Sequence, residues 1–379
     1  MATIGFSRGS LWYLLPVLAG VIGGIALLVP YRDRLGYDYQ HLALGKDAMP
    51  WFATLDGHPI HCMYVEDGAA CLEGWRRRGG RPVVLWLGNS QLHGINQYRQ
   101  GQVTATALLQ PRLAGLGLDL LTFSQPNANF QEHLVMFQYL RQRLPLAALV
   151  LPLVFDDLRE SGLRSGVAAA LSDPPTRGVL AASATGERLL RLDAQSRAEA
   201  ANTAPGATRR TPQEISEAFL DGWLEEHVTL WALRPGIRGA LFNALYEARN
   251  RMFDITSQTR RAMIPARRVV NMAALEDILE TAARHQVPVL TYVAPLRSDV
   301  PTPYIEQEYR EFKTAAQELA RAHGARFVNL EVLVPGALWG TIISPDLRAE
   351  AAIDFMHFQA EGHRLMAQAL ERHLAELAP

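Results

Sequence analysis

Two short polar motifs, far apart in the sequence, contain the residue types of a nucleophilic serine and its base. Ser90 lies in Gly88-Asn89-Ser90-Gln91, and Asp354 precedes His357 by three residues near the carboxyl terminus. A serine hydroxyl becomes a nucleophile when an imidazole takes up its proton, and a carboxylate on the other ring nitrogen fixes the tautomer of that imidazole. The two motifs together predict acyl transfer, with Ser90, His357 and Asp354 as the reacting group, its base and the orienting carboxylate.

The regular elements around these motifs indicate a doubly wound α/β fold. The run 83–87, directly before the serine motif, is continuously apolar, as expected for a parallel strand that is buried on both faces. Further strand-like runs and helix-compatible stretches follow in alternation at 118–123, 132–144, 146–155, 287–293, 304–323, 327–330 and 359–377. This alternation predicts a parallel sheet of five strands with helices on both faces. Reactive groups of such folds lie beyond the carboxyl ends of the strands, where Ser90 is expected.

The turn that carries Ser90 also offers donors for the oxyanion of a tetrahedral intermediate. At a tight strand-to-helix turn, the backbone N–H groups of Ser90 and Gln91 point toward the substrate oxygen. A lone Gly-Asn-Ser or Asp-x-x-His also occurs in ordinary turns, so the prediction depends on the two motifs occurring together.

In this combination the sequence resembles the SGNH (GDSL-like) hydrolase superfamily, over roughly residues 82–160 and 285–379. The first block of that family, G-D-S, corresponds to Gly88-Asn89-Ser90, and its last block, D-x-x-H, to Asp354 and His357. The resemblance implies a Ser-His-Asp enzyme with a flavodoxin-like sheet. The family's second block supplies a backbone amide to the oxyanion, and the resemblance implies that Asn127, where the usual glycine is missing, supplies it here.

The third block of the family, G-x-N-D, is replaced after the third predicted strand by Phe155-Asp156-Asp157. The family asparagine donates to the oxyanion, whereas a carboxylate would repel it. Either Asn129 substitutes for that side chain, or the oxyanion hole consists of backbone amides. Arg159 either binds an anionic group of the substrate or pairs with Asp156 or Glu160, and we favour the internal pair.

The first residues predict a membrane anchor. Residues 11–29 contain no charge, and as a helix they would span about 28 Å, close to the roughly 30 Å hydrocarbon core of a bilayer. No small-residue cleavage site follows them, which favours an uncleaved anchor over a cleaved signal peptide or a buried core helix. We therefore expect an anchor at 1–34 and an α/β domain at 35–379. A helical insertion at 166–265 would interrupt this domain, with loose packing expected over 166–210.

Cys62 and Cys71 are the two cysteines of the chain. The sequence Glu66-Asp67-Gly68 between them favours a turn that would bring them together. One close pair without further ligands argues against zinc and suits a disulfide in an oxidising compartment, although two unlinked buried thiols are the alternative. Because the charges around the anchor are balanced, the cysteines decide the predicted location, with the body of the protein in a bacterial periplasm.

Several other classes of function are not indicated. The 37 basic and 38 acidic residues give a net charge of -1, which does not suggest a surface for nucleic acid. His58 and His61 have no clear third metal ligand, and no G-x-G-x-x-G or Walker motif implies a nucleotide cofactor. We expect neither a metal nor a cofactor.

The sequence as a whole predicts a membrane-anchored serine O-acyltransferase or esterase, acting on acetyl groups of an envelope or exported polysaccharide. In architecture it resembles the envelope proteins that work beside membrane-bound O-acyltransferases, which implies a multi-span membrane partner. The alternative is a non-catalytic, SGNH-like scaffold or glycan-binding subunit, which would fit the missing asparagine of the third block. A secreted esterase for small esters is a further alternative.

Overall fold

The computed structural model describes residues 48–203, 258–342 and 352–377, with a few more residues between 220 and 253. The chain divides into two compact units, one of residues 1–39 and 205–255 and one of residues 40–204 and 256–379. Described residues of the first unit include Trp223 and His227, which are helical and stack with ring centroids 4.8 Å apart. The second unit contains the sheet and both chemical motifs.

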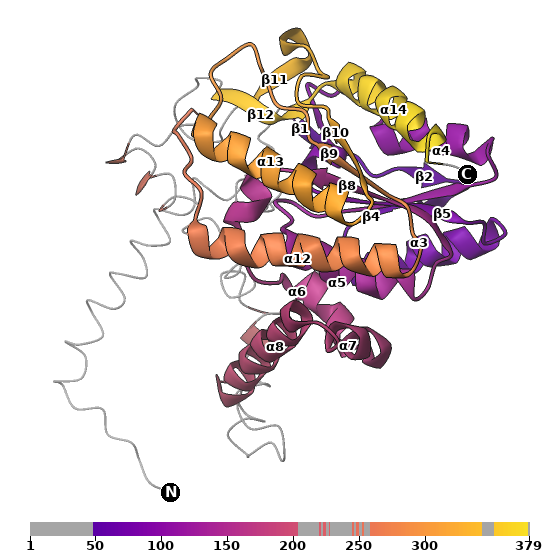
Figure 1. The fold of residues 1–379 in the computed structure, drawn as a ribbon, viewed down its shortest axis with the longest axis vertical. Helices are drawn as coiled ribbons and strands as arrows, with labels where there is room; N and C mark the ends of the chain where they lie inside the picture. Colours follow the sequence, from indigo (N-terminus) through magenta and orange to yellow (C-terminus); the bar gives the residue numbers. More distant parts are fainter. Residues whose placement is uncertain are drawn as a thin grey trace, which may run out of the picture. The chain divides into compact units, whose positions relative to one another are not determined.

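A six-stranded parallel sheet forms the centre of the second unit (Figure 1). Its strands are β4 (His61–Cys62), β5 (Val83–Gly88), β7 (Asp119–Ser124), β8 (Leu146–Leu153), β9 (Val289–Val293) and β10 (Arg326–Asn329). The predicted α/β class and five of the strands are confirmed, but the predicted count of five is wrong. The sixth strand, β4, pairs with β7 at the edge. With two residues it is too short to form a recognisable apolar run.

The strand order, β10-β9-β8-β5-β7-β4, places the reversal of the winding at β5. β5 pairs with β7 on one side and with β8 on the other. Open α/β sheets bind ligands at the carboxyl ends of the strands where the strand order reverses. The 3-10 helix η2 (Ser90–Leu92) follows β5, and η3 (Asp156–Arg159) follows β8. Both chain segments therefore leave the sheet at the reversal point.

Alternate residues of the strands pack into two apolar clusters, one on each face of the sheet. In β5, Val83, Leu85 and Leu87 belong to one cluster, whereas Val84 and Trp86 belong to the other. The first cluster is covered by α3, α5, α12 and α13 and the second by α4 and α14 (Figure 1). The helices are α3 (Val65–Arg77), α4 (Ala105–Ala114), α5 (Phe130–Arg141), α6 (Ser165–Ala168), α7 (Pro174–Leu180), α8 (Ala184–Thr203), α12 (Pro265–Arg284), α13 (Glu306–Ala322) and α14 (Ala360–Ala375).

Among the described residues, three short antiparallel strand pairs lie outside the sheet. They are β1 (Ala48–Pro50) with β6 (Gly94–Asn96), β2 (Thr54–Leu55) with β3 (His58–Pro59), and β11 (Trp339–Ile342) with β12 (Ala352–Phe358). Two further 3-10 helices are η4 (Ala169–Ser172) and η5 (Gly336–Leu338). Strand β12 carries Asp354 and His357, so the second chemical motif lies outside the central sheet.

The first part of the predicted insertion is well packed. Val167, Leu171, Leu180 and Leu189, from α6, η4, α7 and α8, are at most 1% exposed and belong to the apolar core. The expectation of loose packing is therefore wrong for this part. Most of residues 204–257, and the whole predicted anchor at 1–34, lie outside the described residues. Among the helices that are described, none combines the length and hydropathy needed to cross a membrane.

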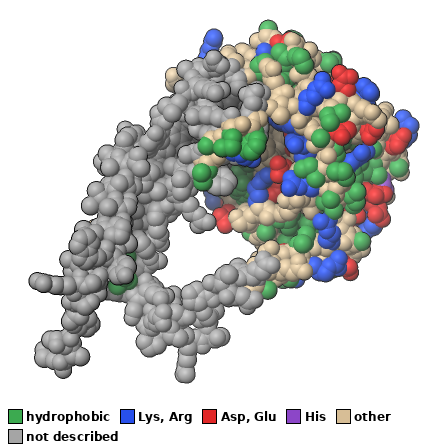
Figure 2. All heavy atoms as spheres, turned by 90° about the vertical axis from the view of Figure 1, so that its left-hand side faces the viewer, with side chains coloured by type: hydrophobic (Ala, Val, Ile, Leu, Met, Phe, Trp, Pro, Cys, Tyr) green, Lys and Arg blue, Asp and Glu red, His purple; other side chains and the backbone are tan. Residues whose placement is uncertain are grey.

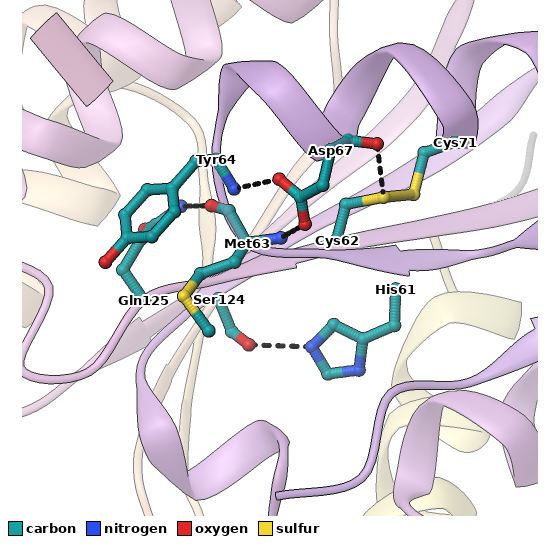
Figure 3. The surroundings of a disulfide bond; sticks show 8 residues. All are labelled: His61, Cys62, Met63, Tyr64, Asp67, Cys71, Ser124 and Gln125. Atoms are coloured by element: carbon teal, nitrogen blue, oxygen red, sulfur yellow. Dashed lines mark hydrogen bonds between the residues drawn. A yellow bond between two sulfur atoms is a disulfide. The ribbon is translucent and has the colours of Figure 1, made fainter. Parts of the chain in front are cut away.

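A disulfide joins the edge strand β4 to α3 (Figure 3). The sulfur atoms of Cys62 and Cys71 are 2.01 Å apart, with 6.4 Å between the Cα atoms, which confirms the predicted pairing. The turn expected at Glu66-Asp67-Gly68 is instead the first turn of α3. There the Asp67 carboxylate accepts hydrogen bonds of 2.6 Å from the backbone N–H groups of Met63 and Tyr64, which satisfies donors at the helix start.

The described surface carries charges of both signs. In Figure 2, basic and acidic side chains lie interspersed over the described residues of the face that it shows, with apolar side chains between them. This face therefore has no single-sign field of the kind that attracts a polyanion.

Candidate active site

Ser90, His357 and Asp354 form one row of hydrogen bonds. The Ser90 hydroxyl oxygen is 2.9 Å from Nε2 of His357, and Nδ1 of His357 is 3.0 Å from Oδ2 of Asp354. The three side chains are nearly buried, at 5%, 3% and 0% exposure. The structure thus brings together residues up to 267 positions apart, in the geometry of a nucleophile, its base and an orienting carboxylate.

An irregularity in a strand pair shapes the segment from Asp354 to His357. Thr341 pairs with Ile353 and Trp339 with Phe358, so one residue of β11 faces four residues of β12. In this bulge, Oδ1 of Asp354 accepts hydrogen bonds from the backbone N–H groups of Met356, at 2.8 Å, and His357, at 3.0 Å. The carboxylate therefore fixes the local backbone as well as the imidazole.

Asn96 is a member of the site that the sequence analysis missed. Its Nδ2 donates to Oδ2 of Asp354 at 2.8 Å and to the carbonyl oxygen of Thr341 at 3.1 Å. Burial by itself would raise the pKa of Asp354, but His357 and the neighbouring N–H groups outweigh it, so the pKa of Asp354 is lowered. Asp354 is therefore ionised at neutral pH, and Nδ1 of His357 carries the proton that it donates to the carboxylate.

The turn that carries Ser90 is held by its neighbours on both sides. Oδ1 of Asn89 accepts from the backbone N–H of Gln91 at 3.1 Å and so caps η2. Nε2 of Gln91 donates to the carbonyl oxygens of Pro295, at 2.9 Å, and Met356, at 3.0 Å. Because Met356 lies between Asp354 and His357, the Gln91 side chain ties the serine turn directly to the histidine segment.

Two of the predicted oxyanion donors are engaged elsewhere. The N–H of Gln91 donates to Asn89, as described above. The Asn129 side chain caps α5, because its Oδ1 accepts from the N–H groups of Gln131 and Glu132, while its Nδ2 donates to the carbonyl oxygen of Gly162. The structure therefore does not support Asn129 as a substitute donor.

Asn127 has an unusual backbone conformation. Its φ is 49°, in the left-handed region that favours glycine, and the residue is exposed. Its carbonyl oxygen accepts a hydrogen bond of 2.6 Å from Arg164. This conformation is one that a glycine would adopt most easily, and the donor role of the Asn127 and Ser90 N–H groups stays a prediction.

The two aspartates after β8 have different surroundings. Asp156 accepts from Arg159 at 3.0 Å and from the Tyr304 hydroxyl at 3.1 Å, and it also pairs with Arg261. Arg159 thus forms the internal pair that we favoured. Asp157 is 1% exposed, and both of its carboxyl oxygens lie 3.2 Å from Nδ2 of Asn89. In the sequence, this contact was indicated only by two polar residues that follow buried strands adjacent in the sheet, Asn89 after β5 and Asp157 after β8.

A second serine at the same edge of the sheet contacts two imidazoles. Ser124 ends β7 and is the register partner of Gly88 in β5. Its hydroxyl oxygen is 2.6 Å from Nε2 of His61 (Figure 3) and 2.7 Å from Nδ1 of His93. Burial lowers the pKa of His93 to about 3 and also lowers the pKa of His61, so both rings are neutral at neutral pH. Within the described ranges, no group of three or more His, Cys, Asp or Glu residues is placed to hold a metal ion.

Comparisons with known proteins give weak similarities only. No protein-family model and no curated protein matches the chain. Among solved structures, an acetylxylan esterase from Geobacillus stearothermophilus is 7% identical, with 77% of this chain and 94% of that chain covered and a TM-score of 0.36. A GDSL-like lipase from Bacteroides thetaiotaomicron is 10% identical, with 80% and 97% covered and a TM-score of 0.33. An α/β hydrolase from the metagenome of Lake Arreo, Spain, is 9% identical, with 79% and 97% covered and a TM-score of 0.36. Similarities this low assign neither a family nor an activity, so the functional argument depends on the site itself.

Proposed function

We propose that the chain is a serine-dependent acyl-transfer enzyme that acts on acyl esters, as an esterase or an O-acyltransferase. The observation that carries this proposal is the hydrogen-bonded row of Asp354, His357 and Ser90 at the carboxyl edge of the sheet. With Nδ1 of His357 donating to an ionised carboxylate, Nε2 is left to accept the serine proton.

The proposed reaction has two halves, and Ser90 and His357 act in both. Oγ of Ser90 attacks the acyl carbonyl carbon while Nε2 of His357 takes up the serine proton, which gives a tetrahedral oxyanion. His357 then returns the proton to the departing alkoxide, and the acyl group remains on Ser90. In the second half His357 deprotonates water or a sugar hydroxyl, whose oxygen attacks the acyl carbon. The bond from that carbon to Oγ of Ser90 then breaks, and His357 returns the proton to Oγ as the acyl group leaves on the attacking oxygen.

We further propose transfer to a sugar hydroxyl of an envelope or exported polysaccharide, with acetyl as the acyl group. The same row of side chains serves a sugar hydroxyl and water alike, so the choice of acceptor is supported by the architectural resemblance to envelope proteins that work beside membrane-bound O-acyltransferases. The disulfide supports an oxidising compartment, for which we propose the bacterial periplasm. A membrane anchor at 1–34 and a multi-span O-acyltransferase as donor partner complete the proposal.

A fluorophosphonate probe tests the nucleophile. We expect the full chain to be labelled at Ser90, and the label to be lost in Ser90→Ala and strongly reduced in His357→Ala. Ser124→Ala is the matched control, since Ser124 also contacts imidazoles, and it should keep the label. If the wild-type chain is folded and Ser90 is not labelled, the non-catalytic scaffold or glycan-binding role is favoured instead.

A measurement in cells tests the transfer step. In the source cells, Ser90→Ala and His357→Ala should each abolish O-acetylation of the polymer while the protein is still produced. Unchanged acetylation with both variants would contradict the transferase role, whatever the probe shows.

A further inference from the structure

Gly340 is the single residue of β11 that faces the segment from Asp354 to His357 in the bulge described above. It is buried, and it is not one of the residues with a positive φ. Its backbone therefore does not require the conformational freedom of a glycine. A glycine at this position is explained by space, not by backbone conformation.

The space beside Gly340 is filled by the side chain of Asn96. A Cβ atom on residue 340 would lie 1.9 Å from Oδ1 of Asn96, 2.1 Å from its Cγ and 2.7 Å from its Nδ2, all inside van der Waals contact. Asn96 is fully buried, and its Nδ2 donates to Oδ2 of Asp354 and to the carbonyl oxygen of Thr341. A side chain at residue 340 would therefore push Asn96 away from the position in which it reaches Asp354.

Arg297, which follows β9, fixes the backbone of Gly340. Its Nη1 donates to the carbonyl oxygen of Gly340 at 2.8 Å, while Nε and Nη2 donate to the two carboxylate oxygens of Asp299 at 2.9 and 3.1 Å. Because the carboxylate holds the guanidinium at two points, the direction of the third donor is set in advance. Two residues earlier, the carbonyl oxygen of Pro295 accepts from the Gln91 side chain. The segment after β9 therefore contacts both the serine turn and the bulge.

We propose that Gly340 and Arg297 are positioning residues for the acid–base half of the site. Arg297 holds Gly340 in the bulge, and the absence of a side chain on Gly340 leaves the room in which Asn96 donates to Asp354. Both residues act through the orientation of Asp354 and not on the reacting atoms. The expected effect on rate rests on the proposed function, whereas the geometry of Asp354 and His357 can be measured without any reaction.

The rate of Ser90 labelling by the fluorophosphonate tests Gly340. Gly340→Ala should be slower than the wild type by about 10-fold or more, because it displaces a donor to a charged group. In the Asn96→Ala background, Gly340→Ala should cause no further loss, since the side chain with which it collides is absent. An equal loss in both backgrounds would overturn the role of Gly340, because the damage would not pass through Asn96. If Gly340→Ala fails to fold and the double variant folds, the collision is confirmed and the Arg297 variants provide the rate test.

Variants of Arg297 test the hold on the bulge. Arg297→Ala should be labelled about 2- to 10-fold more slowly, the factor that corresponds to one net hydrogen bond, and Arg297→Lys should recover part of the rate because it keeps a donor. The matched control is Arg143, which also pairs with an aspartate, Asp173, and donates to a backbone carbonyl oxygen, that of Tyr139. Arg143→Ala should be labelled at the wild-type rate. An equal loss in Arg143→Ala, or no loss in Arg297→Ala, would refute the role of Arg297.

A proton resonance reports the contact between His357 and Asp354 without any substrate. The Nδ1 proton of His357, held against the carboxylate, should give a far-downfield signal in the full chain with isotope-labelled histidine, and His357→Ala assigns it. Gly340→Ala should shift this signal, because moving Asn96 changes the hydrogen bonding of the same carboxylate oxygen, whereas Arg143→Ala should not. An unmoved signal in Gly340→Ala would overturn the proposal.

The two proposals fail in different ways. If the wild type is not labelled at Ser90 but the signal of His357 moves in Gly340→Ala, the proposed function fails and the positioning of Asp354 stands. If the wild type is labelled and both Gly340→Ala and Arg297→Ala react at the wild-type rate, the nucleophile stands and the positioning role is refuted.

Discussion

Removing the Asn96 side chain should slow the chemistry at Ser90 although Asn96 touches neither Ser90 nor His357 by a hydrogen bond. Nδ2 of Asn96 lies 2.8 Å from Oδ2 of Asp354, the same oxygen that accepts from His357. A hydrogen bond to a charged group contributes about 1.5–3 kcal/mol, which corresponds to about 10- to 150-fold in rate. Because Asp354 keeps three other hydrogen bonds, from Nδ1 of His357 and two backbone N–H groups, we expect the lower part of this range for Asn96→Ala.

The pH dependence separates this effect from a general loss of structure. Losing a donor raises the pKa of Asp354, so the part of the acid-side loss of labelling that comes from protonation of this carboxylate should begin at a higher pH in Asn96→Ala. Asn96→Asp keeps the shape but places a second carboxyl group against Asp354. Its labelling should be slower than that of Asn96→Ala at pH 7, because two like charges disfavour the ionised pair. The assay is the rate of Ser90 phosphonylation between pH 4 and 9, with circular dichroism to verify folding. A wild-type rate and an unmoved acid-side loss of labelling in Asn96→Ala would refute the positioning role.

Two further predictions concern stability. Reducing the disulfide, or replacing Cys62 and Cys71 by alanine, should lower the free energy of unfolding by about 2.5 kcal/mol for a sequence separation of 9, measured by urea denaturation; an unchanged midpoint would contradict this. Burial lowers the pKa of His133 to about 3. The unfolded chain therefore binds a proton at this residue below about pH 6.5, whereas the folded chain binds that proton only near pH 3. The free energy of unfolding should therefore fall by about 1 kcal/mol per buried histidine between pH 7 and 5.5. The His133→Leu variant should lose correspondingly less free energy of unfolding over this range. An equal loss in the wild type and the variant would show that His133 does not contribute.

The regular core was predictable because a strand that is buried on both faces is continuously apolar in the sequence. β5, with its run from Val83 to Leu87, has apolar side chains in both clusters and contains no polar residue. α5, α13 and α14 were also expected, from their spaced apolar residues. α4 was not predicted because it contains Pro111, and α3 was not predicted because turn-forming residues lie at its start. The two-residue β4 leaves no pattern and is held by its disulfide and its pairing with β7.

The site was predictable where a motif is local and not where it depends on the fold. The pair of Asp354 and His357 is visible as a spacing of three residues. The contact of Asn96 with Asp354 joins residues 258 positions apart, and the contact of Asn89 with Asp157 joins residues 68 apart. Each depends on which loops meet at the edge of the sheet. Strand order decides this, and a single sequence does not specify strand order.

Ser90 and Ser124 show why the surroundings, and not contact with a histidine, decide which serine can react. The two serines follow or end adjacent strands, and each hydroxyl lies within 2.9 Å of an imidazole nitrogen. Accepting the serine proton creates an imidazolium, which costs much free energy in a buried place unless a negative charge compensates it. His357 has the ionised Asp354 on its other nitrogen. His61 and His93 share Ser124 without a carboxylate partner among the described residues, and burial lowers the pKa of both. Ser124 therefore serves as a hydrogen-bonding link between β4 and the segment after Ser90, and adding a histidine contact to a buried serine does not by itself make a nucleophile.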